Sequence, residues 1–145
     1  MVYGNAYGNV FMPIGALVGE DVGAPLLLIA EVGNVGDDKL VLTYGEPLDE
    51  TSTPATGDFS VGGTSETVSS VAVSGQTVTL TLSDDIHTSD TITVSYTAGT
   101  NPIRDQAEND AADLVDQAVT NNVGNYLQDH DGEYILDHDG NKIPI

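Results

Sequence analysis

The stretch ETVSSVAVSGQTVTLTLS, residues 66–83, limits the possible folds of this chain more than any other. Apolar and polar residues alternate on both sides of Ser-Gly-Gln, which is typical of two strands joined by a tight turn. A period of two excludes a helix over these residues. The apolar positions, which we expect on one buried face, are Val71, Val73, Val78, Leu80 and Leu82.

Other segments alternate in the same way. KLVLTYGEPL brings Leu40, Leu42 and Tyr44 to one face, and DTITVSYTAGT does so with Ile92, Val94 and Tyr96. Short strands separated by turn signals predict an all-β protein with an Ig-like β-sandwich. The expected inward-facing residues include Leu42, Phe59, Val71, Val73, Leu80, Leu82, Val94 and Tyr96.

Three regions differ in composition. Residues 1–36 are rich in Gly and apolar residues and form an N-terminal arm, in which PLLLIAEV is consistent with a buried strand. Residues 37–122 form the sandwich, with Phe59 and Val61 in one strand. Its last part is expected to be a loop with one short helical turn, followed by a strand near residues 117–120. Residues 123–145 are predicted to be a small three-stranded meander.

Charge excludes several classes of function. The chain of 145 residues has 23 acidic and three basic residues, a net charge of -20, and no cysteine. Such a surface repels phosphate, so we expect neither nucleic-acid binding nor docking on an anionic membrane. No apolar run approaches the length of about 20 residues that a membrane span needs. The first ten residues also lack the positive charge of a secretory signal.

Residues 39–122 resemble a known repeat. The phrases LDETSTPATGDF, VSYTAGTNPIRDQAENDAA and QAVTN are similar to the bacterial Ig-like repeat of cyanobacterial swimming-motility surface proteins and other giant adhesins. The resemblance implies an Ig-like sandwich used as a structural or adhesive module, without catalytic residues. Residues 1–36 and 123–145 lie outside it.

The tail repeats an eight-residue phrase, YLQDHDGE at 126–133 and YILDHDGN at 134–141, and each copy contains Asp-Gly. Carboxylates at Asp129, Asp131, Asp137 and Asp139 are weak candidates for a calcium site, because their spacing does not match that of an EF-hand loop. Zinc at His130 and His138 would need a third ligand, and His87 lies far away in the sequence. We therefore expect two turns between equal strands and predict no cofactor.

The loop TAGTNPIRDQAENDAAD is dense in acids. A calcium site between domains and a solvated loop are both compatible with it, and we expect Arg104 to pair with one of Asp105, Glu108, Asp110 and Asp113. The chain lacks a Gly-x-Ser-x-Gly elbow, a phosphate-binding Gly-rich loop and a cysteine nucleophile. The sequence therefore predicts a protein that is not an enzyme.

The apolar arm is the candidate partner-binding segment. Its large side chains, which we expect to be buried against another chain, are Tyr3, Tyr7, Phe11, Met12, Ile14 and Leu17. An extracellular type of module without a secretion signal suggests a tailed-phage virion protein. The first hypothesis is a capsid decoration (cement) protein on the major capsid protein, within a homo-oligomeric assembly in the virion. The alternatives are another virion part (head fibre, neck or tail) or a cell-surface adhesion module that binds sugar, protein or calcium.

Overall fold

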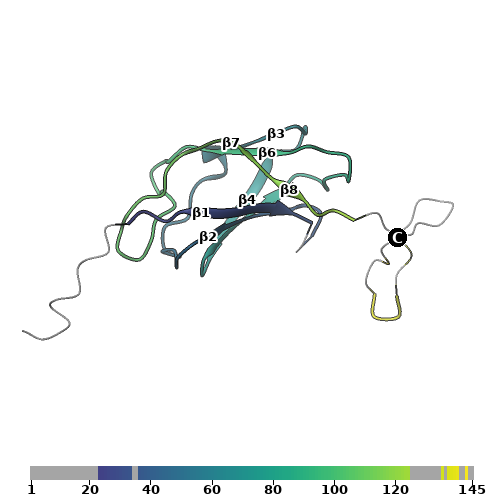
Figure 1. Cartoon of the computed structure of the whole chain (residues 1–145), viewed down its shortest axis with the longest axis horizontal. Coiled ribbons are helices and arrows are strands. Elements are labelled where there is room, and N and C mark those ends of the chain that lie inside the picture. Colours follow the sequence, from purple (N-terminus) through teal and green to yellow (C-terminus); the bar gives the residue numbers. More distant parts are fainter. Residues whose placement is uncertain (1–22, 34–35, 125–134, 136, 141–142, 144–145) are drawn as a thin grey trace, which may run out of the picture.

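A five-stranded sheet forms one layer of the fold (Figure 1). The computed structural model describes residues 23–33, 36–124, 135, 137–140 and 143. The strand order in this sheet is β4-β5-β2-β1-β8. Its strands are β1 (Leu27–Val32), β2 (Lys39–Tyr44), β4 (Val68–Ser74), β5 (Thr77–Leu82) and β8 (Thr120–Asn121).

The second layer is a three-stranded sheet in the order β3-β6-β7. It contains β3 (Phe59–Gly62), β6 (Thr93–Tyr96) and β7 (Leu114–Ala118). A single turn of 3-10 helix, η3 (Thr56–Asp58), is the one helical element among the described residues, and none of their helices could cross a membrane. The prediction of an all-β sandwich is confirmed.

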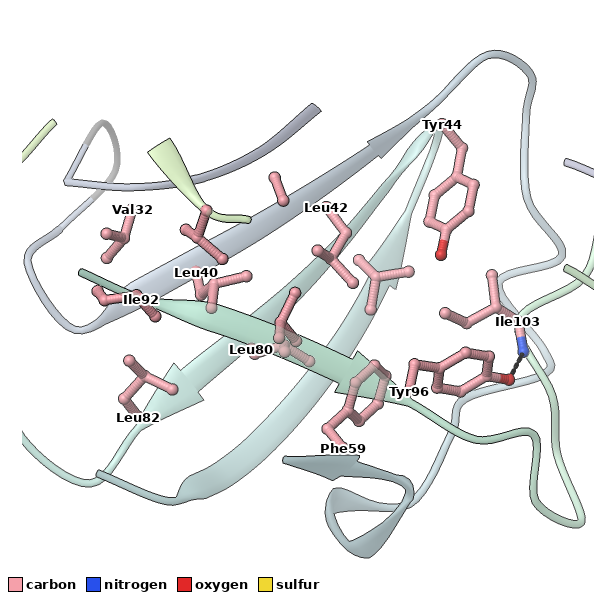
Figure 2. Packing of buried hydrophobic residues seen from close by; sticks show 14 of the residues in the cluster. Val32, Leu40, Leu42, Tyr44, Phe59, Leu80, Leu82, Ile92, Tyr96 and Ile103 are labelled. Carbon is pink, nitrogen blue, oxygen red and sulfur yellow. Dashed lines mark hydrogen bonds between the residues drawn. The ribbon is translucent and has the colours of Figure 1, made fainter. Parts of the chain in front are cut away.

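The core lies between the two sheets (Figure 2). Most of the residues predicted to face inward are confirmed as buried: Leu40, Leu42, Tyr44, Phe59, Val78, Leu80, Leu82, Ile92, Val94 and Tyr96. Val71 and Val73 are only partly buried and pack against this core. Both residues belong to β4, which lies at the edge of its sheet and therefore has a neighbouring strand on one side only.

The predicted hairpin is β4 and β5. Val71 lies opposite Leu80 and Val73 opposite Val78, and the pair Ser74 and Thr77 closes the turn. Gly75, within that turn, has a φ of +57°, a conformation that glycine adopts without steric cost. The alternation and the turn chemistry therefore agree on one register.

Strand β1 is the predicted strand of PLLLIAEV, and it pairs with β2 inside the five-stranded sheet. The sheet thus includes residues that the composition placed in the arm. Ala30 and Val32 are buried, but Leu26, Leu28 and Ile29 are exposed. The expectation that the whole segment is buried is wrong, because the register shifts between Leu27 and Ile29 and interrupts the alternation.

The end of the sandwich also differs from the prediction. Instead of one strand at 117–120, β7 pairs with β6 in one sheet and β8 pairs with β1 in the other. Val119 lies between them, is buried, and donates its N–H to the carbonyl of Ile92. The helical turn expected between 101 and 119 is absent from this fully described segment, which forms backbone bridges instead.

The pairing of β8 with β1 is parallel, with Glu31 opposite Thr120 and Val32 opposite Asn121. Two adjacent parallel strands begin at the same end of a sheet, so the chain reaches β1 at one end of the sandwich and leaves β8 at the other (Figure 1). Gly33, with a φ of +96°, makes this approach possible. A Cβ there would lie 2.5 Å from the nitrogen of Val123.

Candidate functional site

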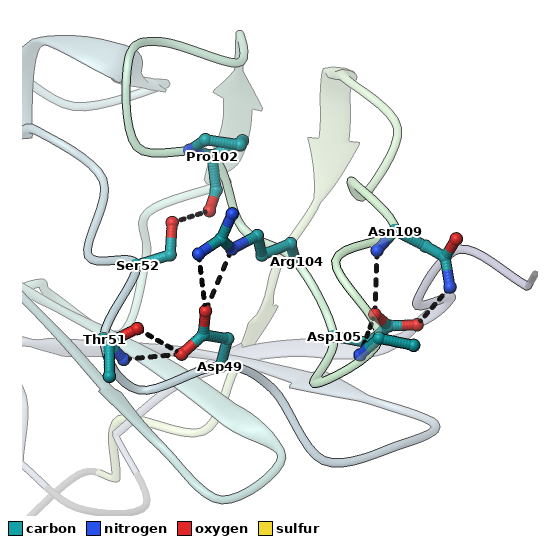
Figure 3. A network of polar contacts seen from close by, with 8 residues as sticks. Asp49, Thr51, Ser52, Pro102, Arg104, Asp105 and Asn109 are labelled. Atoms are coloured by element: carbon teal, nitrogen blue, oxygen red, sulfur yellow. Dashed lines mark hydrogen bonds and ion pairs between the residues drawn. The ribbon is translucent and has the colours of Figure 1, made fainter. Parts of the chain in front are cut away.

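Two long loops, residues 45–58 and 97–113, meet at one end of the sandwich (Figure 3). Leu48 forms a backbone bridge with Asp105, and Asp49 donates its N–H to the carbonyl oxygen of Arg104 over 2.8 Å. The Ser52 hydroxyl donates to the carbonyl oxygen of Pro102 over 2.6 Å. These contacts join the two loops into one polar cluster, the candidate site.

Arg104 binds Asp49 and not an acid of its own loop, so the expected pairing with Asp105, Glu108, Asp110 or Asp113 is wrong. Its Nε and Nη2 lie 2.9 and 2.8 Å from Asp49 Oδ2. The physical reason is the backbone bond between the loops, which brings Asp49 beside Arg104 although 55 positions separate them in the sequence. The distance between Asp49 and Arg104 in the sequence does not indicate that the two residues are in contact.

The other carboxylate oxygen of Asp49 is also occupied. Asp49 Oδ1 accepts hydrogen bonds from the Thr51 N–H over 2.9 Å and from the Thr51 hydroxyl over 2.6 Å. These bonds from Thr51, supplemented by Arg104 and opposed by partial burial, hold the pKa of Asp49 below its usual range. The carboxylate therefore organises a turn and an ion pair.

Asp105 is buried, with 2% of its surface exposed. Its carboxylate accepts hydrogen bonds, each of 2.8 Å, from the Ala107 N–H and from the N–H and Nδ2 of Asn109. Burial raises the pKa of this carboxyl group, but the bonds from Asn109 and Ala107 outweigh it, so the pKa is lower than usual. Asp105 thus closes the turn that contains Glu108, whose φ is +69°.

The remaining acids of this loop do not gather around one point. Glu108 and Asp110 are exposed, and Asp113 Oδ1 accepts the N–H of Ala98 over 2.9 Å. Within the part of the chain that the structure describes, no three His, Asp or Glu side chains form a group that could hold a metal ion.

The second copy of the tail phrase is a turn. Gly140 donates its N–H to the carbonyl of Asp137 over 3.0 Å, Asp139 donates its N–H to Asp137 Oδ1 over 2.9 Å, and Gly140 has a φ of +86°. Ile143 then bonds back to Ile135, as in a hairpin. The turn at 137–140 is therefore as expected, and it leaves Asp137 and Asp139 on the surface.

Other predicted site residues lie beyond the described parts. They are Asp129, His130 and Asp131 of the first tail phrase, and the arm residues Tyr3, Tyr7, Phe11, Met12, Ile14 and Leu17. His138 is exposed, with Nε2 3.0 Å from Asp139 Oδ1. His87 belongs to a turn of the sandwich, where its N–H donates to Asp90 Oδ2 and its carbonyl accepts from Asn121.

Two surface grooves are formed by residues that the structure describes. One, of about 330 Å³, is lined by Thr56, Gly57, Phe59, Ser60, Val61, Glu66, Thr67 and Val68. Its single carboxylate, Glu66, already accepts the Ser83 hydroxyl over 2.6 Å. The other, of about 270 Å³, lies beside Glu46 and Asp105, and Asp105 is committed to its turn. Glu66 and Asp105 in these grooves therefore already have structural partners.

One surface was missed by the sequence analysis. Leu28 and Ile29 of β1, and Leu26 directly before the strand, are exposed to 59%, 46% and 69%. Their apolar run indicated burial, and the sequence contains no signal of the bulge that exposes Leu28 and Ile29. We name these three residues the β1 apolar patch.

The comparisons agree with this architecture. Residues 20–101, more than half of the chain, match the family described as "Putative flagellar system-associated repeat", and the chain belongs to that family. The predicted resemblance to swimming-motility repeats is thereby confirmed for the repeat segment, although the match covers residues 20–101 and not the predicted 39–122. No curated protein matches the chain significantly.

The fold has a solved counterpart. The chain is similar to the N-terminal part of the bacterial S-layer protein SbsC, with a TM-score of 0.54 and 19% sequence identity. The match covers 85% of this chain and 33% of that one, so the chain spans about a third of the length of its counterpart. At this level of identity the likeness concerns the fold alone.

Proposed function

We propose that the chain is a non-enzymatic structural module of a bacterial cell-surface assembly. The parallel pairing of β1 with β8 carries the proposal, because it places the incoming and outgoing chain at opposite ends of a rigid sandwich. Such a module extends a surface protein along one direction. The repeat family and the fold shared with part of an S-layer protein support the same location.

The chemistry of the loops supports the absence of catalysis. The side chains of Asp49, Arg104 and Asp105 are all engaged in hydrogen bonds, and these bonds connect or close loops. A catalytic carboxylate would need a free face toward a substrate. The negative surface suits a module that stays hydrated and separate from its neighbours except at chosen contacts.

The capsid decoration hypothesis competes with this proposal. It depended on the missing secretion signal within the given residues, and neither the family match nor the fold match supports a virion. A cell-surface module accounts for both matches. The virion therefore serves as the alternative outcome of the experiment below.

The experiment is localisation. An antibody raised against recombinant residues 1–145 is used for immunogold labelling of the cells that encode the chain and of phage particles released from them. We expect label on the cell envelope and none on particles. A recombinant sandwich of similar acidity and different sequence, used to absorb the serum, controls for nonspecific charge binding. Label confined to particles would contradict the proposal.

A further inference from the structure

The first half of β1 is apolar and exposed. The bulge between Leu27 and Ile29 turns two consecutive side chains, Leu28 and Ile29, to the outside, and Leu26 lies beside them in sequence. Exposed apolar side chains are common singly, but three neighbouring large ones mark an interaction surface. Leu28 and Ile29 lie on strand β1, and Leu26 directly precedes it. A partner at this position can therefore contact the apolar side chains and form hydrogen bonds with the backbone of the strand.

This half of β1 is also an open edge. The side of β1 that faces away from β2 pairs with β8 only at Glu31 and Val32, so residues 27–30 have no strand partner there among the described residues. Proteins usually protect such edges with charged side chains. Residues 22–30 contain no charged residue, although the whole chain has 26, the sum of 23 acidic and three basic ones.

One segment of the chain has the matching chemistry. Residues 1–19 contain no Asp, Glu, Lys or Arg, and they hold the large apolar side chains of the arm. They end four residues before Gly23, the first residue that the structure describes. Two copies that each have a net charge of -20 repel one another, and a contact between two uncharged segments brings no like charges together at the interface.

We propose that residues 1–19 of one copy dock on the β1 apolar patch of a second copy and extend its sheet beyond the open edge of β1. Backbone bonds along the edge supply affinity, and Leu26, Leu28 and Ile29 supply apolar contact. The inference rests on the proposed function to the extent that a surface assembly requires contact between copies.

The test uses the absence of cysteine from the chain. Two full-length variants, Tyr7→Cys and Leu28→Cys, carry tags of different size and are mixed and mildly oxidised. We expect a mixed disulfide dimer in several-fold excess over the same experiment with Ala72→Cys in place of Leu28→Cys. Ala72 is an exposed residue of β4, at the opposite edge of the same sheet, and is therefore the matched control.

Other outcomes overturn the inference. A chain with both substitutions that forms its disulfide within the monomer at every dilution, while the mixture gives none, means that the arm docks on its own chain. Equal yields from Leu28→Cys and Ala72→Cys mean that the patch is not the docking site.

A second variant avoids chemical crosslinking. Leu28→Ser combined with Ile29→Thr should convert oligomers to monomers in light scattering and leave the melting temperature nearly unchanged, because both side chains are exposed. An unchanged oligomeric mass contradicts the inference. If the disulfide forms between copies but the antibody labels only phage particles, the proposed function alone fails.

Discussion

Two buried tyrosines show how much a single hydroxyl depends on its surroundings. The Tyr96 hydroxyl accepts the N–H of Ile103 over 2.8 Å (Figure 2), whereas the Tyr44 hydroxyl has no hydrogen-bond partner in the described part of the chain. Burial raises the pKa of both phenols, and the proximity of Tyr96 adds to the effect at Tyr44. Neither tyrosine ionises in the neutral range, so their difference is one of hydrogen bonding.

The two tyrosines therefore respond differently to loss of the hydroxyl. Tyr96→Phe leaves the Ile103 N–H without its acceptor and should lower the free energy of unfolding by about 1–3 kcal/mol. Tyr44→Phe removes an unsatisfied buried group and should raise it by about 1 kcal/mol. Urea denaturation measures both. Equal losses in the two variants would mean that Tyr44 has a partner after all.

Asp49 makes the stability depend on acid. Its pKa is lower in the folded chain than in the unfolded one, through Thr51 first and Arg104 in addition. The ionised form therefore stabilises the fold above the unfolded pKa of about 3.9, and this contribution is lost as the pH falls through the folded pKa. Asp49→Asn should melt below the wild type at pH 7, and the gap should narrow progressively as the pH falls below about 4.

The control for this prediction is Asp110→Asn, which makes the same change in net charge at an exposed position of the same end of the molecule. Protonation also relieves the repulsion among 23 acidic residues, so the comparison between variants is the informative quantity. Melting curves between pH 3 and pH 7 supply it. A gap between Asp49→Asn and the control that is independent of pH would contradict the assignment.

At the scale of the element, the β4–β5 hairpin contains a matched pair. Val71 and Leu80 lie opposite one another, yet Leu80 is fully buried and Val71 only partly. Leu80→Ala should cost about 2–5 kcal/mol, as other buried leucines do. Val71→Ala should cost clearly less, because its strand is at the edge. Chemical denaturation of both variants measures the two losses. Similar losses would mean that the edge strand is packed as tightly as the centre.

The strands that the sequence predicted share one property. In β5 and β6 the alternation of the sequence agrees with burial at every position, and in β2 it does so except at Val41, which is buried as well. In β1 the bulge moves Leu28 and Ile29 to the outside, and a bulge has no compositional signal in LLLI. The chain changes sheets at Val119 because β8 has β1 as its partner, and that partner is distant in sequence.

The candidate site was less predictable for the same reason. Asp-Gly at 139–140 forms its turn from local chemistry, and the sequence predicted it. Arg104 and Asp49 meet because two loops are bonded through their backbones, which depends on the whole sandwich. The local sequence was sufficient to predict turns and the buried faces of strands, whereas the contacts between loops depend on the three-dimensional fold.

At the scale of the whole molecule, the direction of β8 relative to β1 determines how the sandwich responds to tension. In addition to the parallel pairing, Asn122 donates its N–H to the carbonyl of Val32 over 2.8 Å and its Nδ2 to Glu31 Oε2 over 3.1 Å. A pull applied at residues 23 and 124 slides β1 along β8, and ladder bonds lie across the direction of sliding. Under this load the hydrogen bonds between β1 and β8 must break at the same time.

Tension along this direction should therefore meet higher resistance than tension across a hairpin. The chain has no cysteine, so handles can be placed uniquely at residues 23 and 124, or at Thr67 and Ser83, the open end of the β4–β5 hairpin. The second geometry opens the hairpin one bond at a time. Single-molecule force measurements should give a clearly higher unfolding force for the first geometry.

A variant separates this resistance from general stability. Gly33→Ala places a Cβ 2.5 Å from the Val123 nitrogen at a positive φ, which displaces the chain after β8 from β1. It should lower the force at residues 23 and 124 and leave the force at Thr67 and Ser83 nearly unchanged. Gly45→Ala, whose Cβ would meet its nearest atoms at 3.8 Å, is the control. Equal forces in both geometries for the wild type would show that the β1–β8 pair bears no special load.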